Sequence, residues 1–132
     1  MDVLETIERF WQARMKDDKA TVLTFLSEGA TYEMVGASAF SDPATVGPAA
    51  AAKQAADRLI DDFHFHDLER ISAVVQGRQA AVVNRLQVSF RGGAPVTTEV
   101  CDVWEFDADG KVRSLRQFVD THLVRGMLDR VA

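Results

Sequence analysis

One acidic residue, Asp102, lies in the middle of an apolar, strand-like stretch, VTTEVCDVWEF, at residues 96–106. A carboxyl group in apolar surroundings is costly unless it is paired, hydrogen-bonded or neutral. Asp102 is therefore either a partner in a buried ion pair or the working acid of a pocket. Because side chains alternate along a strand, Trp104 shares the face of Asp102, and Cys101 points the opposite way.

Polar residues on the neighbouring stretches could complete such a pocket. Arg85 and Gln87 are two residues apart on the preceding strand, so they share one of its faces. With Tyr32 and Gln117 they form a predicted polar floor, where Asp102 is the general acid and base and Arg85 stabilises negative charge. The alternative is an Asp102–Arg85 ion pair that only neutralises two buried charges.

The histidines and the cysteine are weaker candidates for chemistry. His64 and His66 share a strand face next to Asp67, but the sequence offers no clear further ligand, so we predict no metal site. Cys101 has no adjoining basic residue that would lower its pKa, which favours an inert, buried thiol. No phosphate-binding glycine loop is present, and we predict no cofactor.

Three helices are predicted before the main run of strands. Apolar residues recur at helical spacing over residues 4–15, 21–27 and 49–63. A strand is predicted at residues 30–35, and residues 36–47 form a loop long enough to act as the rim of a pocket.

From residue 64 onward the apolar period changes to two. This predicts strands over residues 65–75, 79–91, 96–106 and 111–124, joined by short turns. Strict alternation along the last strand puts Asp120 on the opposite face from Gln117. The expected fold is α+β in a single domain, 1–132, with the three helices packed on a strongly bent, mainly antiparallel sheet.

Composition excludes several classes of function. The chain has 132 residues, a net charge of −5 and no cluster of basic residues, so nucleic acid and anionic membranes are poor partners. Its one cysteine permits no internal disulfide, and the N-terminus lacks a secretion signal pattern. No apolar run reaches the ~18 residues of a membrane span. These features predict a soluble cytoplasmic protein.

Two motifs in this order of elements resemble the nuclear transport factor 2-like superfamily. They are FL…GATY at residues 25–32 and CDVWEF at residues 101–106, and the resemblance runs from residue 7 to residue 123. This superfamily includes ketosteroid isomerases, SnoaL-like polyketide cyclases and limonene-epoxide hydrolases. The resemblance implies a cone-shaped α+β barrel, with Asp102 facing into the cone. Function must come from the site, because the superfamily hosts unrelated chemistries.

The resemblance to ketosteroid isomerases covers part of their site. Asp102 falls where those enzymes keep a protonated aspartic acid that donates to an oxyanion. Their general base falls at Met34, which takes no proton, and their tyrosine falls near Phe10, which has no hydroxyl. Two of the three parts of that mechanism are therefore replaced.

The resemblance to epoxide hydrolases is also incomplete. Tyr32 and Arg85 match their tyrosine and arginine, and their asparagine again falls at Met34. Their two aspartates fall at Gln87 and Gln117, and glutamine holds a water without deprotonating it.

Two functions stay open at this point. The first is binding of a small hydrophobic molecule of polyketide, steroid or terpenoid type, with cofactor-independent isomerisation, cyclisation or hydrolysis. Asp102 and Arg85 would act on it, and Tyr32, Gln87, Gln117, Met34, Trp104 and Phe10 would hold it. The second is a non-catalytic ligand-binding or assembly module. We expect a homodimer through the outer sheet face, formed by Leu86, Val88 and Phe90.

Overall fold

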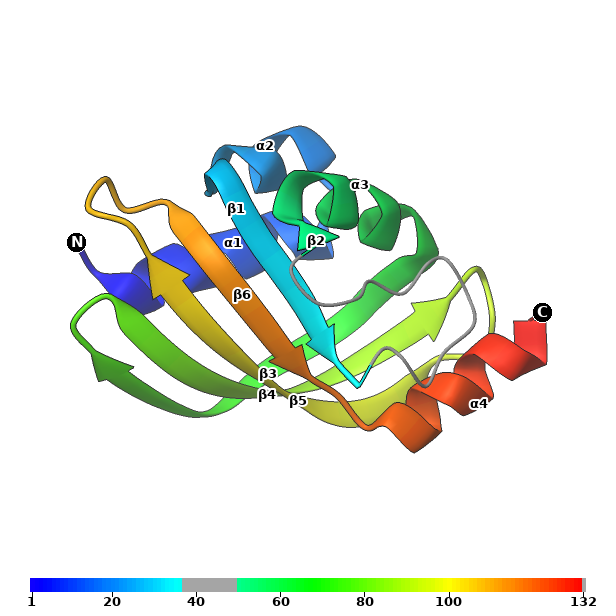
Figure 1. Cartoon of the computed structure of the whole chain (residues 1–132). Helices are drawn as coiled ribbons and strands as arrows, with labels where there is room; N and C mark the ends of the chain where they lie inside the picture. The colour runs from blue at the N-terminus through cyan, green and yellow to red at the C-terminus, as the bar shows by residue number, and fades with distance from the viewer. Residues whose placement is uncertain (37–49, 132) are drawn as a thin grey trace.

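A computed structural model describes residues 1–36 and 50–131 of the chain. The predicted loop at residues 36–47 lies almost wholly outside these described residues. The elements are α1 (Val3–Met15), α2 (Lys19–Thr24), β1 (Leu26–Val35), β2 (Ala50–Ala51), α3 (Ala52–Asp62), β3 (Phe63–Gln76), β4 (Gln79–Phe90), β5 (Val96–Phe106), β6 (Val112–Phe118) and α4 (Thr121–Val131). Helices α1, α2 and α3 lie over one side of a curved sheet, and α4 lies at the end of β6 (Figure 1).

Short polar side chains fix where the first helices begin. Asp2 caps α1 by accepting a hydrogen bond from the Glu5 N–H at 3.0 Å, and Asp18 caps α2 by accepting from the Thr21 N–H at 3.2 Å. These bonds satisfy backbone donors that a helix leaves unpaired at its start. Asp17, between the two helices, takes the left-handed conformation with φ 53°, which turns the chain sharply.

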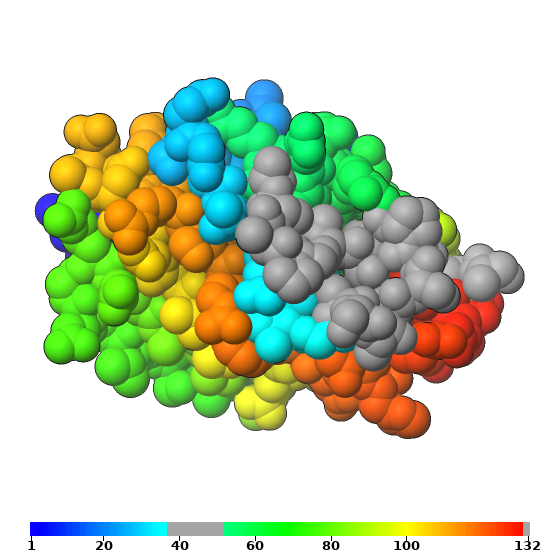
Figure 2. All heavy atoms as spheres, viewed as in Figure 1, coloured from blue at the N-terminus to red at the C-terminus, as the bar shows by residue number. Residues whose placement is uncertain are grey.

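The sheet has the order β2-β1-β6-β5-β4-β3 and is mixed. Strand β1 runs parallel to β6, and the other pairs are antiparallel. In the space-filling view of the same side, the residues of β1 and β6 lie next to each other at the surface (Figure 2). The predicted α+β fold, with three helices packed on a strongly bent, mainly antiparallel sheet, is confirmed.

The prediction of one long last strand is wrong. Strand β6 ends at Phe118, and helix α4 begins at Thr121. Asp120 caps this helix by accepting a hydrogen bond from the Leu123 N–H at 3.0 Å. An aspartate with periodic apolar residues after it is a helix-start signal, and here that signal overrides the alternating pattern.

Aromatic side chains dominate the core between α1 and the concave face of the sheet. Phe10 of α1 packs edge-on against Trp104 of β5, with ring centroids 5.0 Å apart. Trp11 packs in the same way on Phe65 of β3, at 5.1 Å. This packing holds α1 across the sheet. In the part of the chain that the structure describes, no helix is long and apolar enough to cross a membrane.

Candidate functional site

Four polar side chains lie on neighbouring strands along the concave face of the sheet: Tyr32 on β1, Gln117 on β6, Asp102 on β5 and Asn84 on β4. Asp102 is paired directly with Gln117 on one side and with Val82 on the other. Asn84 is two residues from Val82 and therefore shares its face. Polar groups on the concave face of a sheet are expensive to bury, so this row is a candidate site.

Asp102 is completely enclosed by the protein. Its exposed surface is 0%, and neither carboxyl oxygen has a hydrogen-bond partner among the described residues. Burial raises the pKa of Asp102 to about 7, and the facing Gln117 amide partly opposes this shift by lowering the pKa. The protonated and ionised forms are therefore both accessible near neutral pH.

Tyr32 and Gln117 form the tightest polar contact of the row. The Tyr32 hydroxyl donates to Gln117 Oε1 at 2.6 Å. Burial raises the pKa of Tyr32 far above its ordinary value, and the charge of Asp102 acts in the same direction. Arg14 partly opposes this shift in the pKa of Tyr32. Tyr32 is therefore a neutral hydroxyl that can donate one hydrogen bond.

A cavity lies between the helices and this part of the sheet. All four helices and the five longer strands contribute to its wall, which is mostly aliphatic and aromatic. Its volume is about 100 Å³, several times the ~10–15 Å³ that one water needs on this measure. Polar groups enter the wall from Arg14, Tyr32, Thr98, Gln117 and Asp120. An apolar cavity with few polar groups is typical of a site for a small molecule.

Four of the predicted site residues contribute to the wall of this cavity: Phe10, Tyr32, Met34 and Gln117. Asp102 and Trp104 have no exposed surface, so they are packed behind the wall. Asp102 is therefore separated from the cavity, and Gln117, which it faces across the β5–β6 pair, contributes to the cavity wall.

The predicted placement of Arg85 and Gln87 is wrong. Both are exposed on the outer face of β4, and Arg85 Nη1 lies 3.6 Å from Glu69 Oε2. The register pairs Val82 with Asp102, so even-numbered residues of β4 face the cavity. Alternation predicted correctly that Arg85 and Gln87 share a face, but only the pairing of β4 with β5 decides which face. The proposed Asp102–Arg85 ion pair does not form.

The same register places Leu86, Val88 and Phe90 inside the molecule. Their exposed fractions are 2%, 6% and 1%, and Leu86 and Val88 line the cavity. The prediction that these three residues form a dimer interface is therefore wrong.

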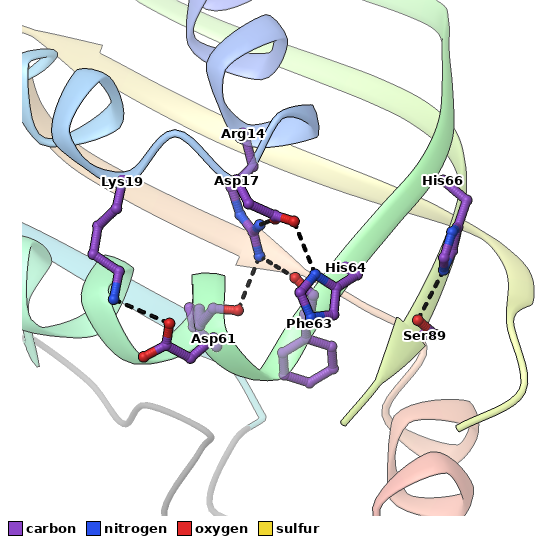
Figure 3. A network of polar contacts seen from close by, with 9 residues as sticks. Arg14, Asp17, Lys19, Asp61, Phe63, His64, His66 and Ser89 are labelled. Carbon is purple, nitrogen blue, oxygen red and sulfur yellow. Dashed lines mark hydrogen bonds and ion pairs between the residues drawn. The ribbon is translucent and has the colours of Figure 1, made fainter. Parts of the chain in front are cut away.

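Arg14 supplies the positive charge that was expected from Arg85. It is 6% exposed, and its Nη2 donates to the carbonyls of Leu59 at 2.9 Å and Phe63 at 2.7 Å. Nη1 lies 3.3 Å from Asp17 Oδ1 (Figure 3). Burial lowers the pKa of Arg14 to about 10, so the group stays charged at neutral pH. Helical spacing gave no sign of this role, because Arg14 looked like an ordinary residue of the last turn of α1.

Asp120 is a carboxylate in the cavity wall that the strand pattern misplaced. Alternation put it opposite Gln117, but the strand ends at Phe118, and both residues contribute to the cavity wall, with Asp120 exposed to solvent. One oxygen of Asp120 holds the start of α4. Its place before the apolar run of α4 was a signal for a helix cap that could have found it.

The histidines and the cysteine make local contacts. His64 Nδ1 lies 3.0 Å from Asp17 Oδ2, and His66 Nε2 lies 2.8 Å from Ser89 Oγ (Figure 3). Within residues 1–36 and 50–131, no group of three His, Cys, Asp or Glu side chains could hold a metal ion. Burial raises the pKa of Cys101, and the charge of Asp102 adds to this, which disfavours a thiolate.

Residues 7–115 match the SnoaL-like domain family. The chain belongs to this family. It is similar in structure to an LEH-like epoxide hydrolase from M. tuberculosis, with 23% identity and a TM-score of 0.70 over 96% of this chain and 90% of that one. Among curated proteins, none matches the chain in sequence.

Two further solved structures show the same fold. An NTF2-like protein from Burkholderia pseudomallei has 14% identity and a TM-score of 0.75, over 96% of this chain and 97% of that one. TerC, co-crystallised with polyporic acid, has 15% identity and a TM-score of 0.74, over 98% of this chain and 99% of that one. The SnoaL-like domain is thus also an NTF2-like fold, as the sequence motifs predicted.

Proposed function

We propose that this SnoaL-like domain binds a small, mainly apolar molecule with one polar group in the cavity. The observation that carries the proposal is the Tyr32–Gln117 hydrogen bond of 2.6 Å in an otherwise apolar wall. The apolar wall provides affinity by removing hydrocarbon from water, and the polar pair orients the ligand. A compound of polyketide, steroid or terpenoid type has this apolar character, and its binding requires the cavity, about 100 Å³ in the structure, to widen. TerC, which has the same fold, was co-crystallised with polyporic acid, and this supports a small organic molecule as the ligand.

We further propose acid–base chemistry on this ligand, without a cofactor, as an isomerase, cyclase or hydrolase would perform it. The pKa of Asp102, about 7, suits a group that gives and takes protons at neutral pH. Gln117 and Tyr32 connect it to the cavity, and Asp120 is the carboxylate in the wall itself. Arg14 would stabilise negative charge that develops on the ligand.

Ligand-dependent thermal stability tests the binding proposal. Steroids, terpenoid epoxides and aromatic polyketides should include compounds that raise the thermal midpoint, because a ligand of the folded state stabilises it by mass action. Val100→Phe, which fills the cavity from β5, should abolish the shift. Thr97→Phe, exposed on the same strand, is the matched control and should keep it.

A second cavity-filling variant keeps the test valid if Val100→Phe does not fold. Ala56→Leu narrows the cavity from the α3 side, opposite the sheet. An unchanged midpoint shift in both Val100→Phe and Ala56→Leu would place the ligand elsewhere. The absence of any shift in the wild type would favour the alternative, an assembly module.

We propose that the protein forms a homodimer through the outer face of the sheet, with residues other than those first expected. Val74, Val103 and Phe118 are 70%, 37% and 40% exposed. Val74 and Val103 both pair with Ala81, and Phe118 pairs with Cys101, so they share the outer face. Exposed apolar residues on one sheet face favour an interface, and here Arg116 also lies over the Phe118 ring, with its Cζ 5.3 Å from the ring centroid. The cytoplasmic location also remains a prediction.

A further inference from the structure

Three groups in series connect the enclosed Asp102 to the cavity. Asp102 faces Gln117 across the β5–β6 pair, and the Gln117 amide meets the Tyr32 hydroxyl at 2.6 Å. Tyr32 and Gln117 line the cavity, whereas Asp102 is 0% exposed. The amide has an acceptor at one end and a donor at the other, and the two ends are nearly equal in size. A half-turn of the amide therefore exchanges donor and acceptor with little change in packing.

We propose that the Gln117 amide reverses its orientation with the protonation state of Asp102, and thereby decides whether Tyr32 offers the ligand a hydrogen-bond donor or only an acceptor. This inference rests on the proposed binding function of the cavity. It concerns which polar group the cavity selects, and it assigns Gln117 as a positioning residue.

With Asp102 ionised, Gln117 keeps Oε1 on the Tyr32 hydroxyl, as in the structure, and its amide nitrogen is free to close on the Asp102 carboxylate, which has no hydrogen-bond partner there. The carboxylate only accepts hydrogen bonds, so the Gln117 amide nitrogen turns toward it and Oε1 points to Tyr32. The Tyr32 hydroxyl then donates its single hydrogen bond to Gln117 Oε1, as the 2.6 Å contact shows. The cavity meets only the lone pairs of the Tyr32 oxygen, which accept a hydrogen bond from an alcohol or a phenol.

With Asp102 protonated, the direction of every bond in the series reverses. The Asp102 hydroxyl donates to Gln117 Oε1, and the amide nitrogen donates to the Tyr32 oxygen. The Tyr32 proton is released into the cavity, where it can bind a ketone or quinone oxygen. One proton enters, on Asp102, and no other bond is made or broken. If the amide kept its first orientation, the Asp102 hydroxyl would face the amide nitrogen, a donor against a donor, and a buried donor would be left unpaired, which is costly.

The other titratable groups near the Gln117 amide do not change protonation near neutral pH, so Asp102 alone controls the switch. Tyr32, on β1, keeps its proton because its pKa is raised, and Arg14, on α1, keeps its charge at a pKa of about 10. Cys101 points to the other face of β5, and its pKa is raised as well. The pKa of Asp102, about 7, places the reversal near neutral pH.

Two probes with the same bicyclic frame test this inference. 2-Tetralone carries a carbonyl, which only accepts, and 2-naphthol carries a hydroxyl, which can donate. As the pH rises from about 5.5 to about 8, the affinity for 2-tetralone should fall about five- to tenfold, the worth of one hydrogen bond. The affinity for 2-naphthol should change little, because it finds a partner in either state.

Variants distinguish an effect transmitted through Asp102, Gln117 and Tyr32 from a general effect of pH on binding. Gln117→Met breaks the connection, so 2-tetralone binding should lose its pH dependence while Asp102 still titrates. Asp102→Asn should remove the pH dependence, and Arg85→Gln, on the outer face, should retain it. Tyr32→Phe should remove the gain in 2-tetralone affinity at low pH, because the variant has no hydroxyl proton to release into the cavity.

The outcomes distinguish this inference from the binding proposal. If both probes bind the wild type with equal pH profiles, or if Gln117→Met keeps the pH dependence, the switch is wrong and the binding function stands. If neither probe binds at any pH, and no larger ligand shifts the thermal midpoint, the proposed function fails, and the switch fails with it.

Discussion

Asp102 and Gln117 face each other across β5 and β6 on the concave side of the sheet. Asp102 therefore lies beside a neutral amide rather than a cation, and burial raises its pKa to about 7. A buried acid without a countercharge is a cost to the fold, and sites of function are where proteins retain such costs. The pair is consequently more informative about function than about stability.

Asp102→Asn should stabilise the protein at high pH. The pKa of Asp102 is raised when the chain folds, so between about pH 4 and pH 7 the folded state holds a proton that the unfolded chain has lost. Stability from this group is present at low pH and is lost as pH rises through 7, by up to about 4 kcal/mol. Urea unfolding at pH 5 and pH 8 measures the difference between wild type and variant.

The stability advantage of Asp102→Asn over the wild type should grow by about 2–3 kcal/mol from pH 5 to pH 8. Glu99→Gln, exposed on the other face of β5, is the matched control and should show no such divergence. A variant that is strongly destabilised at both pH values would instead show that the carboxyl group itself supports the fold.

Arg14→Met should destabilise the protein at all pH values near neutral. The Arg14 guanidinium binds the carbonyls of Leu59 and Phe63 and lies over the Phe65 ring, with Cζ 4.6 Å from the centroid. Hydrogen bonds to charged groups contribute about 1.5–3 kcal/mol, and the substitution leaves two carbonyls without this partner. We expect a loss of about 2–4 kcal/mol in urea unfolding.

Arg14→Met should also destabilise one region of the fold more than the rest. Amide hydrogen exchange should accelerate first where α3 meets β3, because Arg14 ties α1 to that junction. Arg9→Met, on the exposed side of α1, should have little effect. Equal effects of the two variants would remove the special role of Arg14.

The sequence predicted elements better than it predicted which way their side chains face. Alternation identified β4 and β5, yet Arg85 and Leu86 were assigned to opposite faces from those they occupy. Each strand has two equivalent phases, and the choice between them depends on register with its neighbour, which is a long-range property. Asp102 was placed correctly because its apolar neighbours made only one face suitable for burial.

Local signals also competed at the end of the chain. In the sequence, the alternating pattern of β6 continues past Phe118 and conceals the helix cap at Asp120. A cap decides the structure of only a few residues, but here those residues bring a second carboxylate to the cavity. Arg14 was missed for a different reason, since its partners are backbone carbonyls that no side-chain pattern reveals.

Two substitutions at Asp120 should separate its two roles. Asp120→Asn keeps an oxygen that can accept from the Leu123 N–H, so stability should stay within a few tenths of a kcal/mol. Asp120→Ala removes the cap and should cost about 1 kcal/mol. If Asp120 acts as a base on the ligand, both variants should lose turnover of a compound that the wild type converts. Turnover retained in Asp120→Asn would leave Asp120 as a helix cap alone.

A single charge on the outer sheet face should dissociate the proposed dimer. Val74 is 70% exposed and lies across β4 from Val103, so Val74→Arg puts a charge among the exposed apolar residues of the outer face, at the edge strand β3. Burying an unpaired charge in an interface is strongly unfavourable, and the sedimentation equilibrium mass should fall to that of one chain, 14.6 kDa. Arg70→Ala, on the same strand but away from the patch, should leave the mass unchanged. A wild type that already sediments as a monomer at micromolar concentration would show that this face has no second copy of the chain as its partner.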